Sequence, residues 1–365
     1  MAGSQTVIPS RAEQEHLMQT QRTRQTQLQR SGYSLLELVV TIVMIGIVVS
    51  LTLPALQRSR QSSKKLSCLN NMRNLGLAIV NYSSTDNSQL PLLVDTDRIW
   101  STHGNAHNAN RSWCIAILPY LDQVGFRERW DLTARVAAGP DSTVQSAAEK
   151  KLSQLKATRI PIFTCYDDDT AADPGALSYC ANIGYVTSNF NTASDTSHYA
   201  NSADGGFDAD PSVDTDVPMK FASGVFWRPH TSRMSLDFIS AADGMTQTLM
   251  LSENLQAGEW HATTTGEIGF GVDMAGILNG ASLKLPANYD LRTATTDSRI
   301  GSQLRAEKGT AWRPSSNHPS GAVNVIYCDG SGRSLVPSMD PGVYARLFTP
   351  AGLRYGQDAV DGTSF

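Results

Sequence analysis

An uninterrupted apolar segment lies near the N-terminus of this 365-residue chain. Residues 38–56 read LVVTIVMIGIVVSLTLPAL and contain no charged side chain. At about 1.5 Å per residue, a helix over this segment is roughly 28 Å long, which matches the hydrocarbon thickness of a bilayer. A globular core rarely needs a helix that is apolar on every face. A signal peptide usually has a shorter apolar region with small residues at its cleavage site, whereas Arg58 and Arg60 follow here. The pattern therefore predicts a transmembrane helix.

An amphipathic pattern continues this helix. Apolar side chains recur every three or four residues, and polar side chains lie between them. The pattern ends at the polar residues 83–88 and at Pro91. One long helix over residues 33–83 is therefore expected, and its apolar stripe is expected to be core. The stripe consists of Leu66, Leu69, Met72, Leu75, Ile79 and Tyr82.

Beyond residue 90, short apolar runs alternate with clusters of Gly, Asn, Asp and Ser. This texture predicts an α+β domain with a largely antiparallel sheet. Residues 187–220 are expected to form a long surface loop. The expected strands are Ile160–Tyr166, Ser178–Val186, Ser223–Trp227, Gln247–Ser252, Gly266–Val272, Ala322–Cys328 and Arg333–Val336. The expected helices are Ile115–Gln123, Val144–Lys156, Leu236–Ala241 and Pro341–Phe348.

Composition and charge exclude several classes of protein. The hydrophobic content of 41% is typical of a folded chain, and the net charge of −4 gives no support for a nucleic-acid partner. The five cysteines contain no CxxC pair, which excludes zinc ribbons and thioredoxin-type sites. Cys165 and Cys180 flank a short Asp/Pro/Gly loop and suit a disulfide outside the cytoplasm. The alternative is a pair of buried thiols in two strands.

The sequence offers few candidate catalytic or metal-binding residues. The sequence contains no GxSxG, HExxH, Walker or GxGxxG motif, so we expect no enzyme. Asp204, Asp208 and Asp210 are candidate oxygen ligands for calcium. They lack the spacing of an EF-hand, and an acidic solvated loop is the simpler interpretation.

The residues before the apolar segment read RSGYSLLEL, from Arg30 to Leu38. This stretch resembles the type IV prepilin signature. The resemblance implies that a prepilin peptidase/N-methyltransferase cuts between Gly32 and Tyr33 and methylates the new amine. Glu37 is then the fifth residue, and the resemblance implies that it pairs with the amine of a neighbouring subunit. A carboxylate in an apolar helix costs several kcal/mol unless it is paired. The alternative is a glutamate that lies at the level of the lipid headgroups.

The segment from Asn317 to Gly330 resembles the His-x9-Asp-Gly signature of a large bacterial family of prepilin-type proteins, whose head domain has no known function. Ten residues, not nine, separate His318 from Asp329 here. The Asp329-Gly330 pair suits the tight turn of a β-hairpin. A histidine such as His318 is more often a hydrogen-bonded loop residue than a ligand. Three further segments fit the same family, and they are residues 67–78, 112–123 and 242–253.

These resemblances imply an architecture like that of a type II secretion pseudopilin. The leader is expected at 1–32, the transmembrane segment at 33–56, the continued helix at 57–90 and an extracytoplasmic head at 91–365. Positive charges flank both ends of the span, so charge alone does not give the orientation. The resemblance implies that the N-terminus lies on the cytoplasmic side of the cytoplasmic membrane. The expected partners are the lipid bilayer and other pilin-like subunits. The alternative is a monomeric anchored surface protein whose head recognises a glycan, a polymer or a protein.

Overall fold

The computed structural model divides the chain into two compact units, Met1–Ser59 and Arg60–Phe365. The predicted processing site, Gly32 and Tyr33, lies outside the described residues. The candidate calcium ligands Asp204, Asp208 and Asp210 also lie outside them. The structure describes residues 34–99, 107–137, 142–186, 222–227, 233–274, 277, 283–286, 289–293 and 296–358.

The predicted long helix is confirmed as α2, Leu35–Thr85. In the smaller unit its large apolar side chains are exposed. The hydroxyl groups of Thr41 and Ser50 donate hydrogen bonds to carbonyl groups of their own helix, at 2.8 Å each, as expected for polar side chains in an apolar span. This part of α2 is long and apolar enough to cross a membrane, a property that anchors and signal sequences share.

The C-terminal half of α2 is a core helix of the larger unit. Met72, Leu75 and Ile79 are fully buried, which confirms the centre of the predicted stripe. Leu66 is 62% exposed, so the prediction is wrong at the start of the stripe. The buried face begins instead at Cys68, two residues later and therefore on a different side of the helix.

The helix makes a close approach to the sheet at Gly76. A Cβ atom at this position would lie 3.0 Å from Ile326 Cγ2 and 3.3 Å from Met250 Cε. The absence of a side chain therefore lets α2 pack directly on the sheet.

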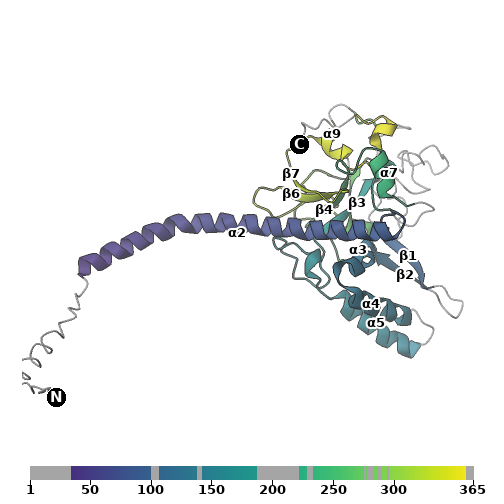
Figure 1. Cartoon of the computed structure of the whole chain (residues 1–365), viewed down its shortest axis with the longest axis horizontal. Helices are drawn as coiled ribbons and strands as arrows, with labels where there is room; N and C mark the ends of the chain where they lie inside the picture. The colour runs from purple at the N-terminus through teal and green to yellow at the C-terminus, as the bar shows by residue number, and fades with distance from the viewer. Residues whose placement is uncertain are drawn as a thin grey trace, which may run out of the picture. The chain divides into compact units, whose positions relative to one another are not determined.

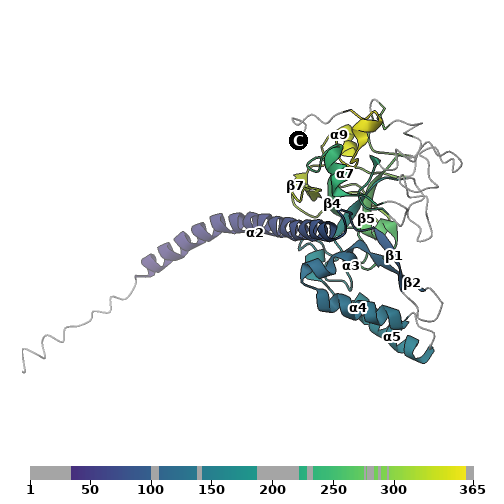
Figure 2. The same cartoon turned by 45° about the vertical axis from the view of Figure 1, so that its right-hand side comes forward.

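The main sheet has the strand order β5-β3-β4-β6-β7. Figure 1 labels β3, β4, β6 and β7, and Figure 2 labels β5. Only the β3–β5 pair is parallel, and the β3–β4, β4–β6 and β6–β7 pairs are antiparallel. The predicted α+β class with a largely antiparallel sheet is confirmed. The strands are β3 (Tyr179–Val186), β4 (Leu249–Glu253), β5 (Gly269–Asp273), β6 (Val323–Tyr327) and β7 (Gly332–Leu335).

The two faces of this sheet carry different elements. The hydroxyl group of Tyr179 donates to Thr164 O at 3.1 Å on the face that α2 covers. On the opposite face, Phe270 packs edge-to-face on Phe348, which follows α9 (Pro341–Arg346). Both faces are therefore covered, which explains why β3, β4, β5 and β6 are buried along their whole length.

A second group of elements lies beside the sheet. Helices α4 and α5 lie side by side, as both views show (Figures 1 and 2). Strands β1 and β2 form a separate antiparallel pair. The elements are β1 (Val94–Ile99), β2 (His107–Ser112), α3 (Trp113–Ile117), η1 (Leu118–Leu121), α4 (Val124–Ala137) and α5 (Ser142–Lys156). The remaining ones are η2 (Pro161–Phe163), α7 (Leu236–Ala241), α8 (Thr265–Ile268) and η4 (Gly352–Tyr355).

Prediction and structure differ at several elements, and strands β1 and β2 and helix α8 were not expected. Ile160–Tyr166 contains the 3-10 turn η2 instead of a strand, because Pro161 favours the first position of a helical turn. Ser223–Trp227 is irregular, although the backbone N–H groups of Val225 and Phe226 both donate to Asn182 O. Short apolar runs mark burial more reliably than they mark strands. The helix α4 was not expected at all.

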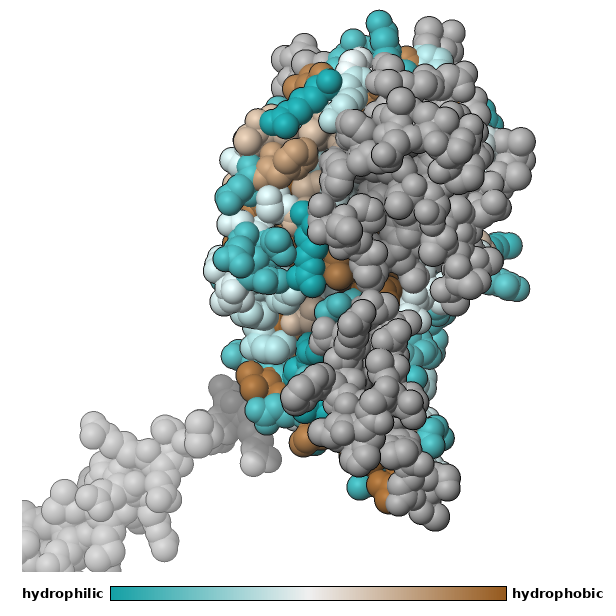
Figure 3. Space-filling view, turned by 90° about the vertical axis from the view of Figure 1, so that its right-hand side faces the viewer, coloured by the Kyte–Doolittle hydropathy of each residue, from teal (hydrophilic) through white to brown (hydrophobic). Residues whose placement is uncertain are grey.

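The described side chains on the face in Figure 3 are mainly hydrophilic, and hydrophobic ones lie in separate small groups. The exposed large apolar side chains concentrate instead in residues 35–56 of α2. Exposed apolar side chains are therefore much denser in the first part of α2 than on this face of the larger unit.

Candidate functional site

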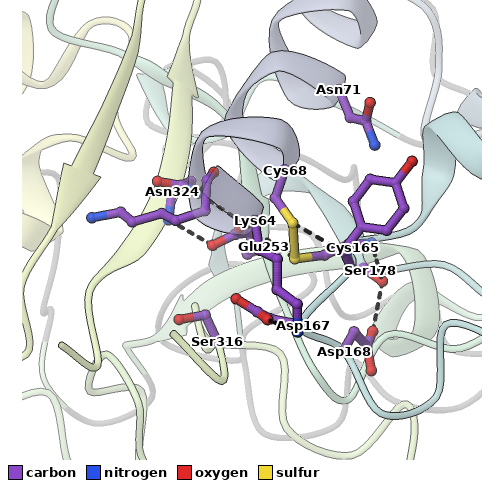
Figure 4. The surroundings of a disulfide bond; sticks show 12 residues. Lys64, Cys68, Asn71, Cys165, Asp167, Asp168, Ser178, Glu253, Ser316 and Asn324 are labelled. Atoms are coloured by element: carbon purple, nitrogen blue, oxygen red, sulfur yellow. Dashed lines mark hydrogen bonds and ion pairs between the residues drawn. A yellow bond between two sulfur atoms is a disulfide. The ribbon is translucent and has the colours of Figure 1, made fainter. Parts of the chain in front are cut away.

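Three segments of the chain that are distant in sequence meet at one buried cluster (Figure 4). Cys68 comes from residues 67–78, Glu253 from residues 242–253 and His318 from the Asn317–Gly330 segment. Together with Cys165, they place two sulfur atoms, one carboxylate oxygen and one ring nitrogen within 4.8 Å of one another. Segments singled out separately in the sequence thus form a single site.

A disulfide bond joins Cys68 in α2 to Cys165, which lies just after η2. The two Cα atoms are 5.0 Å apart, and 97 residues separate the cysteines in sequence. The predicted Cys165–Cys180 bond is therefore wrong. Successive side chains of a strand point to opposite faces of the sheet. Tyr179 faces α2, so Cys180 points away from it and its thiol lies 3.8 Å from Glu267 O.

The remaining cysteines are buried thiols, as the alternative interpretation of Cys180 expected. They are Cys114, Cys180 and Cys328. Burial raises the pKa of each thiol. A raised pKa keeps a thiol protonated and unreactive.

The chain around Cys165 is held by a local set of hydrogen bonds. The backbone N–H of Cys165 donates to Ser178 Oγ at 3.0 Å, and that hydroxyl donates to Asp168 Oδ2 at 2.6 Å. The backbone N–H of Tyr166 points at Cys68 Sγ, 3.2 Å away. This segment therefore presents Cys165 to α2 in a defined orientation.

His318 lies between two carboxylates. Its Nδ1 is 2.8 Å from Asp167 Oδ2 and its Nε2 is 3.1 Å from Glu253 Oε1, and the side chain is 0% exposed. Burial lowers the pKa of His318, but the hydrogen bonds and negative charges of Glu253 and Asp167 outweigh burial and raise the pKa above 6.5. The imidazolium form donates through both nitrogens. Lys64 Nζ lies 3.1 Å from Asp167 Oδ1, so two cations balance two anions.

Glu253 connects the cluster to the sheet and to the helix. Its Oε2 accepts the backbone N–H of Asn324 at 2.8 Å, and its Oε1 accepts Asn324 Nδ2 at 3.0 Å. The same amide group donates to Lys65 O in α2 at 3.2 Å. Sequence reasoning missed Cys68, Asp167, Glu253 and Asn324 as site residues. Cys68, Glu253 and Asn324 lie inside the segments that resemble the family, and this location was the only indication of them in the sequence.

A family model accounts for these segments. The model described as protein of unknown function DUF1559 matches residues 57–342, which is most of the chain. The chain belongs to the DUF1559 family. This family is associated with bacterial pilin-like surface proteins. No curated protein and no solved structure matches the chain. The predicted processing site at Gly32 and Tyr33 lies outside the matched residues.

The two ends of the signature segment are separate in this DUF1559 protein. Asp329 is exposed in the turn between β6 and β7, where its Oδ1 accepts the backbone N–H of Ser331 at 2.8 Å. Gly330 has a φ of 80°, which supports the interpretation of a tight hairpin turn. His318 instead bonds Asp167 and Glu253. The structure thus confirms His318 as a hydrogen-bonded loop residue and does not bring it together with Asp329.

The charge on His318 predicts a pH-dependent stability. The pKa of His318 is raised in the folded state. Its protonation therefore contributes fully to the free energy of unfolding below about pH 6.5, and this contribution is lost as the pH rises through the folded-state pKa. The free energy of unfolding of the disulfide-bonded protein should therefore fall as the pH rises above about 6.5. Guanidinium titrations from about pH 5 to about pH 9 measure it. His318→Gln should flatten this dependence, and an unchanged pH profile in that variant would contradict the assignment.

Proposed function

We propose that this DUF1559 protein is a pseudopilin-like structural protein of the bacterial surface, with no enzymatic activity. In this proposal, α2 is a single-pass anchor in the cytoplasmic membrane. The N-terminus lies inside, and the head lies in the periplasm or at the cell surface. The observation that carries the proposal is the dual character of α2. Its first half exposes an apolar surface in the smaller unit, and its second half is a core helix of the larger one.

The buried cluster supports a mechanical role. A covalent bond, the Lys64–Asp167 ion pair and the hydrogen bond from Asn324 to Lys65 O all tie α2 to the rest of the larger unit. A force that acts along the helix therefore passes through a covalent bond into the segment that contains Cys165. Both ring nitrogens of His318 bond carboxylates and its side chain is not exposed, so this histidine belongs to the buried connection and not to an open site.

The first test is processing of the N-terminus. We expect the protein isolated from bacterial membranes to begin at N-methylated Tyr33. The same protein from cells without the prepilin peptidase should retain residues 1–32. Intact mass and N-terminal sequencing measure both. A mature chain that begins at Met1, or after residue 56, would refute the pilin-like proposal.

The second test is assembly through Glu37. This glutamate lies in the first turn of α2, is exposed and takes part in no ion pair in the described part of the chain. We expect Glu37→Ala to abolish cross-linking between subunits in membranes while the amount of anchored protein stays constant, because the carboxylate pairs with a neighbouring amine.

The matched control for Glu37 is Thr41→Ala, one turn further along the exposed helix. This change removes only an intrahelical hydrogen bond to Leu38 O. It should leave cross-linking intact. Equal cross-linking in wild type and Glu37→Ala would refute assembly through this residue.

A monomeric binding protein is the second candidate, because the head contains a polar cavity of about 470 Å³. Lys284, Tyr289, Asp340, Arg346 and Gln357 line it, and this mixture of charged, hydroxyl and amide groups suits a polar ligand such as a glycan. This candidate predicts that Glu37→Ala changes nothing, whereas substitutions in the cavity abolish ligand binding. The cross-linking experiment therefore separates the two functions.

A further inference from the structure

The buried cluster contains the complete ligand set of a metal site. Cys68 Sγ, Cys165 Sγ, Glu253 Oε1 and His318 Nε2 converge from four segments, and these atoms lie within 4.8 Å of one another. We propose that the reduced protein binds one zinc ion through these four residues, and that the Cys68–Cys165 disulfide and the zinc are alternative occupants of the same site.

The distances fit a four-coordinate ion. Bonds of about 2.0–2.3 Å in a tetrahedron put neighbouring ligand atoms roughly 3.3–3.8 Å apart. His318 Nε2 and Glu253 Oε1 are already 3.1 Å apart, and Cys165 Sγ is 3.8 Å from the same oxygen. The two bonded sulfur atoms have to separate, and cleavage of the bond between them allows that. Two thiolates, an imidazole and a carboxylate form a donor set that favours zinc.

The groups around these ligands are those that orient metal ligands in proteins. A ligating histidine commonly donates its other ring N–H to a carboxylate, as His318 Nδ1 does to Asp167 at 2.8 Å. The second oxygen of Glu253 is held by the backbone N–H of Asn324 at 2.8 Å, which leaves Oε1 directed at the site. Oε1 also accepts Asn324 Nδ2 at 3.0 Å and keeps a second lone pair for the ion.

Cys68 Sγ also has a neighbouring donor that would stabilise a negative charge on it. The backbone N–H of Tyr166 lies 3.2 Å from Cys68 Sγ, and such a donor stabilises a thiolate. A disulfide sulfur carries no negative charge, whereas a thiolate is the form that binds metals. Zinc binding therefore requires the reduced protein.

The chemistry balances with a dithiol as the reductant. The dithiol gives two electrons and two protons to the Cys68–Cys165 bond and becomes a disulfide, and the two cysteines become thiols. When Zn²⁺ binds, both thiol protons and the proton on His318 Nε2 pass to solvent. The ion then joins α2 to Cys165, so zinc closes the same loop that the disulfide closes.

The test uses the full chain in detergent and zinc chloride as the probe. Protein is stripped with a chelator, divided into an oxidised and a dithiol-reduced portion, desalted without oxygen and equilibrated with zinc. We expect about one zinc per chain in the reduced portion and almost none in the oxidised portion, measured by elemental mass spectrometry. Cobalt(II) in place of zinc should give the thiolate charge-transfer band and the intense visible bands of a tetrahedral site. Reduced protein that binds no zinc overturns the proposal, as does equal binding by both portions.

Variants identify the ligands. Reduced Cys68→Ser and His318→Gln should lose the zinc, whereas the matched control Cys180→Ser, which removes a buried thiol outside the cluster, should keep it. Retention of zinc by both ligand variants overturns the proposal. Asp167→Asn keeps all four ligands, so it tests the site even if a ligand variant fails to fold. It should weaken zinc affinity by about 10–100-fold at unchanged stoichiometry, and unchanged affinity counts against the site.

Discussion

Replacement of His318 by leucine is expected to lower the free energy of unfolding of the disulfide-bonded protein by about 3–5 kcal/mol. The substitution removes the cation between Glu253 and Asp167 and leaves Glu253, which is 2% exposed, as a buried carboxylate without its charged partner. The loss of one member of a buried charge network costs more than the loss of the whole network, since the remaining charge stays desolvated. Guanidinium unfolding, followed by the fluorescence of the buried tryptophans, measures the change.

The matched control is the other end of the signature segment. Asp329→Asn keeps the oxygen that accepts the Ser331 N–H and lies in an exposed turn, so it should change stability by less than about 0.5 kcal/mol. A double variant of His318→Leu with Glu253→Leu should cost less than the sum of the two single changes, because they remove one interaction. Additive single changes, or equal effects at His318 and Asp329, would show that the interaction of His318 with Glu253 does not stabilise the protein.

Loss of the disulfide is the second large effect. Cys68→Ala is expected to lower the free energy of unfolding of the oxidised protein by about 4–5 kcal/mol, because the bond closes a loop of about 100 residues and restricts the unfolded chain. Cys165→Ala should cost nearly the same. The double variant should cost no more than either single one, since all three remove the same bond.

The connectivity can be measured directly. Asp167, Asp168 and Asp169 lie between Cys165 and Cys180, so a protease that cuts beside aspartate separates the two cysteines. Non-reducing peptide mass spectrometry should find the Cys68 peptide joined to the Cys165 peptide, with Cys180 as a free thiol. A Cys165–Cys180 peptide pair would contradict the structure and restore the prediction made from the sequence.

The sequence predicted elements well where one local rule decides them. Helix α2 extends over Leu35–Thr85 against a predicted 33–83, because helical periodicity and the absence of charge are local properties. The turn at Asp329-Gly330 follows from the conformational freedom of glycine. The same local reasoning failed at Ile160–Tyr166, where the apolar run marked burial but the proline determined the shape.

The candidate site was only partly accessible from the sequence. His318 was singled out as a hydrogen-bonded loop residue, but its partners Asp167 and Glu253 were not found from the sequence. Cys165 was singled out with the wrong partner. For Cys165 the nearer cysteine in sequence was preferred, and the actual partner came from α2.

The sequence by itself determined the apolar and amphipathic helix, the α+β class, most strands of the sheet and the hairpin turn. These follow from periodicity, turn residues and side-chain size, which act over a few residues. Only the tertiary structure decided the partners of Cys165 and His318. Cys68 lies 97 residues from Cys165, and Glu253 lies 65 residues from His318. Such pairs depend on how α2 crosses the sheet and on which face each strand residue points to, and no local spacing in the chain encodes either.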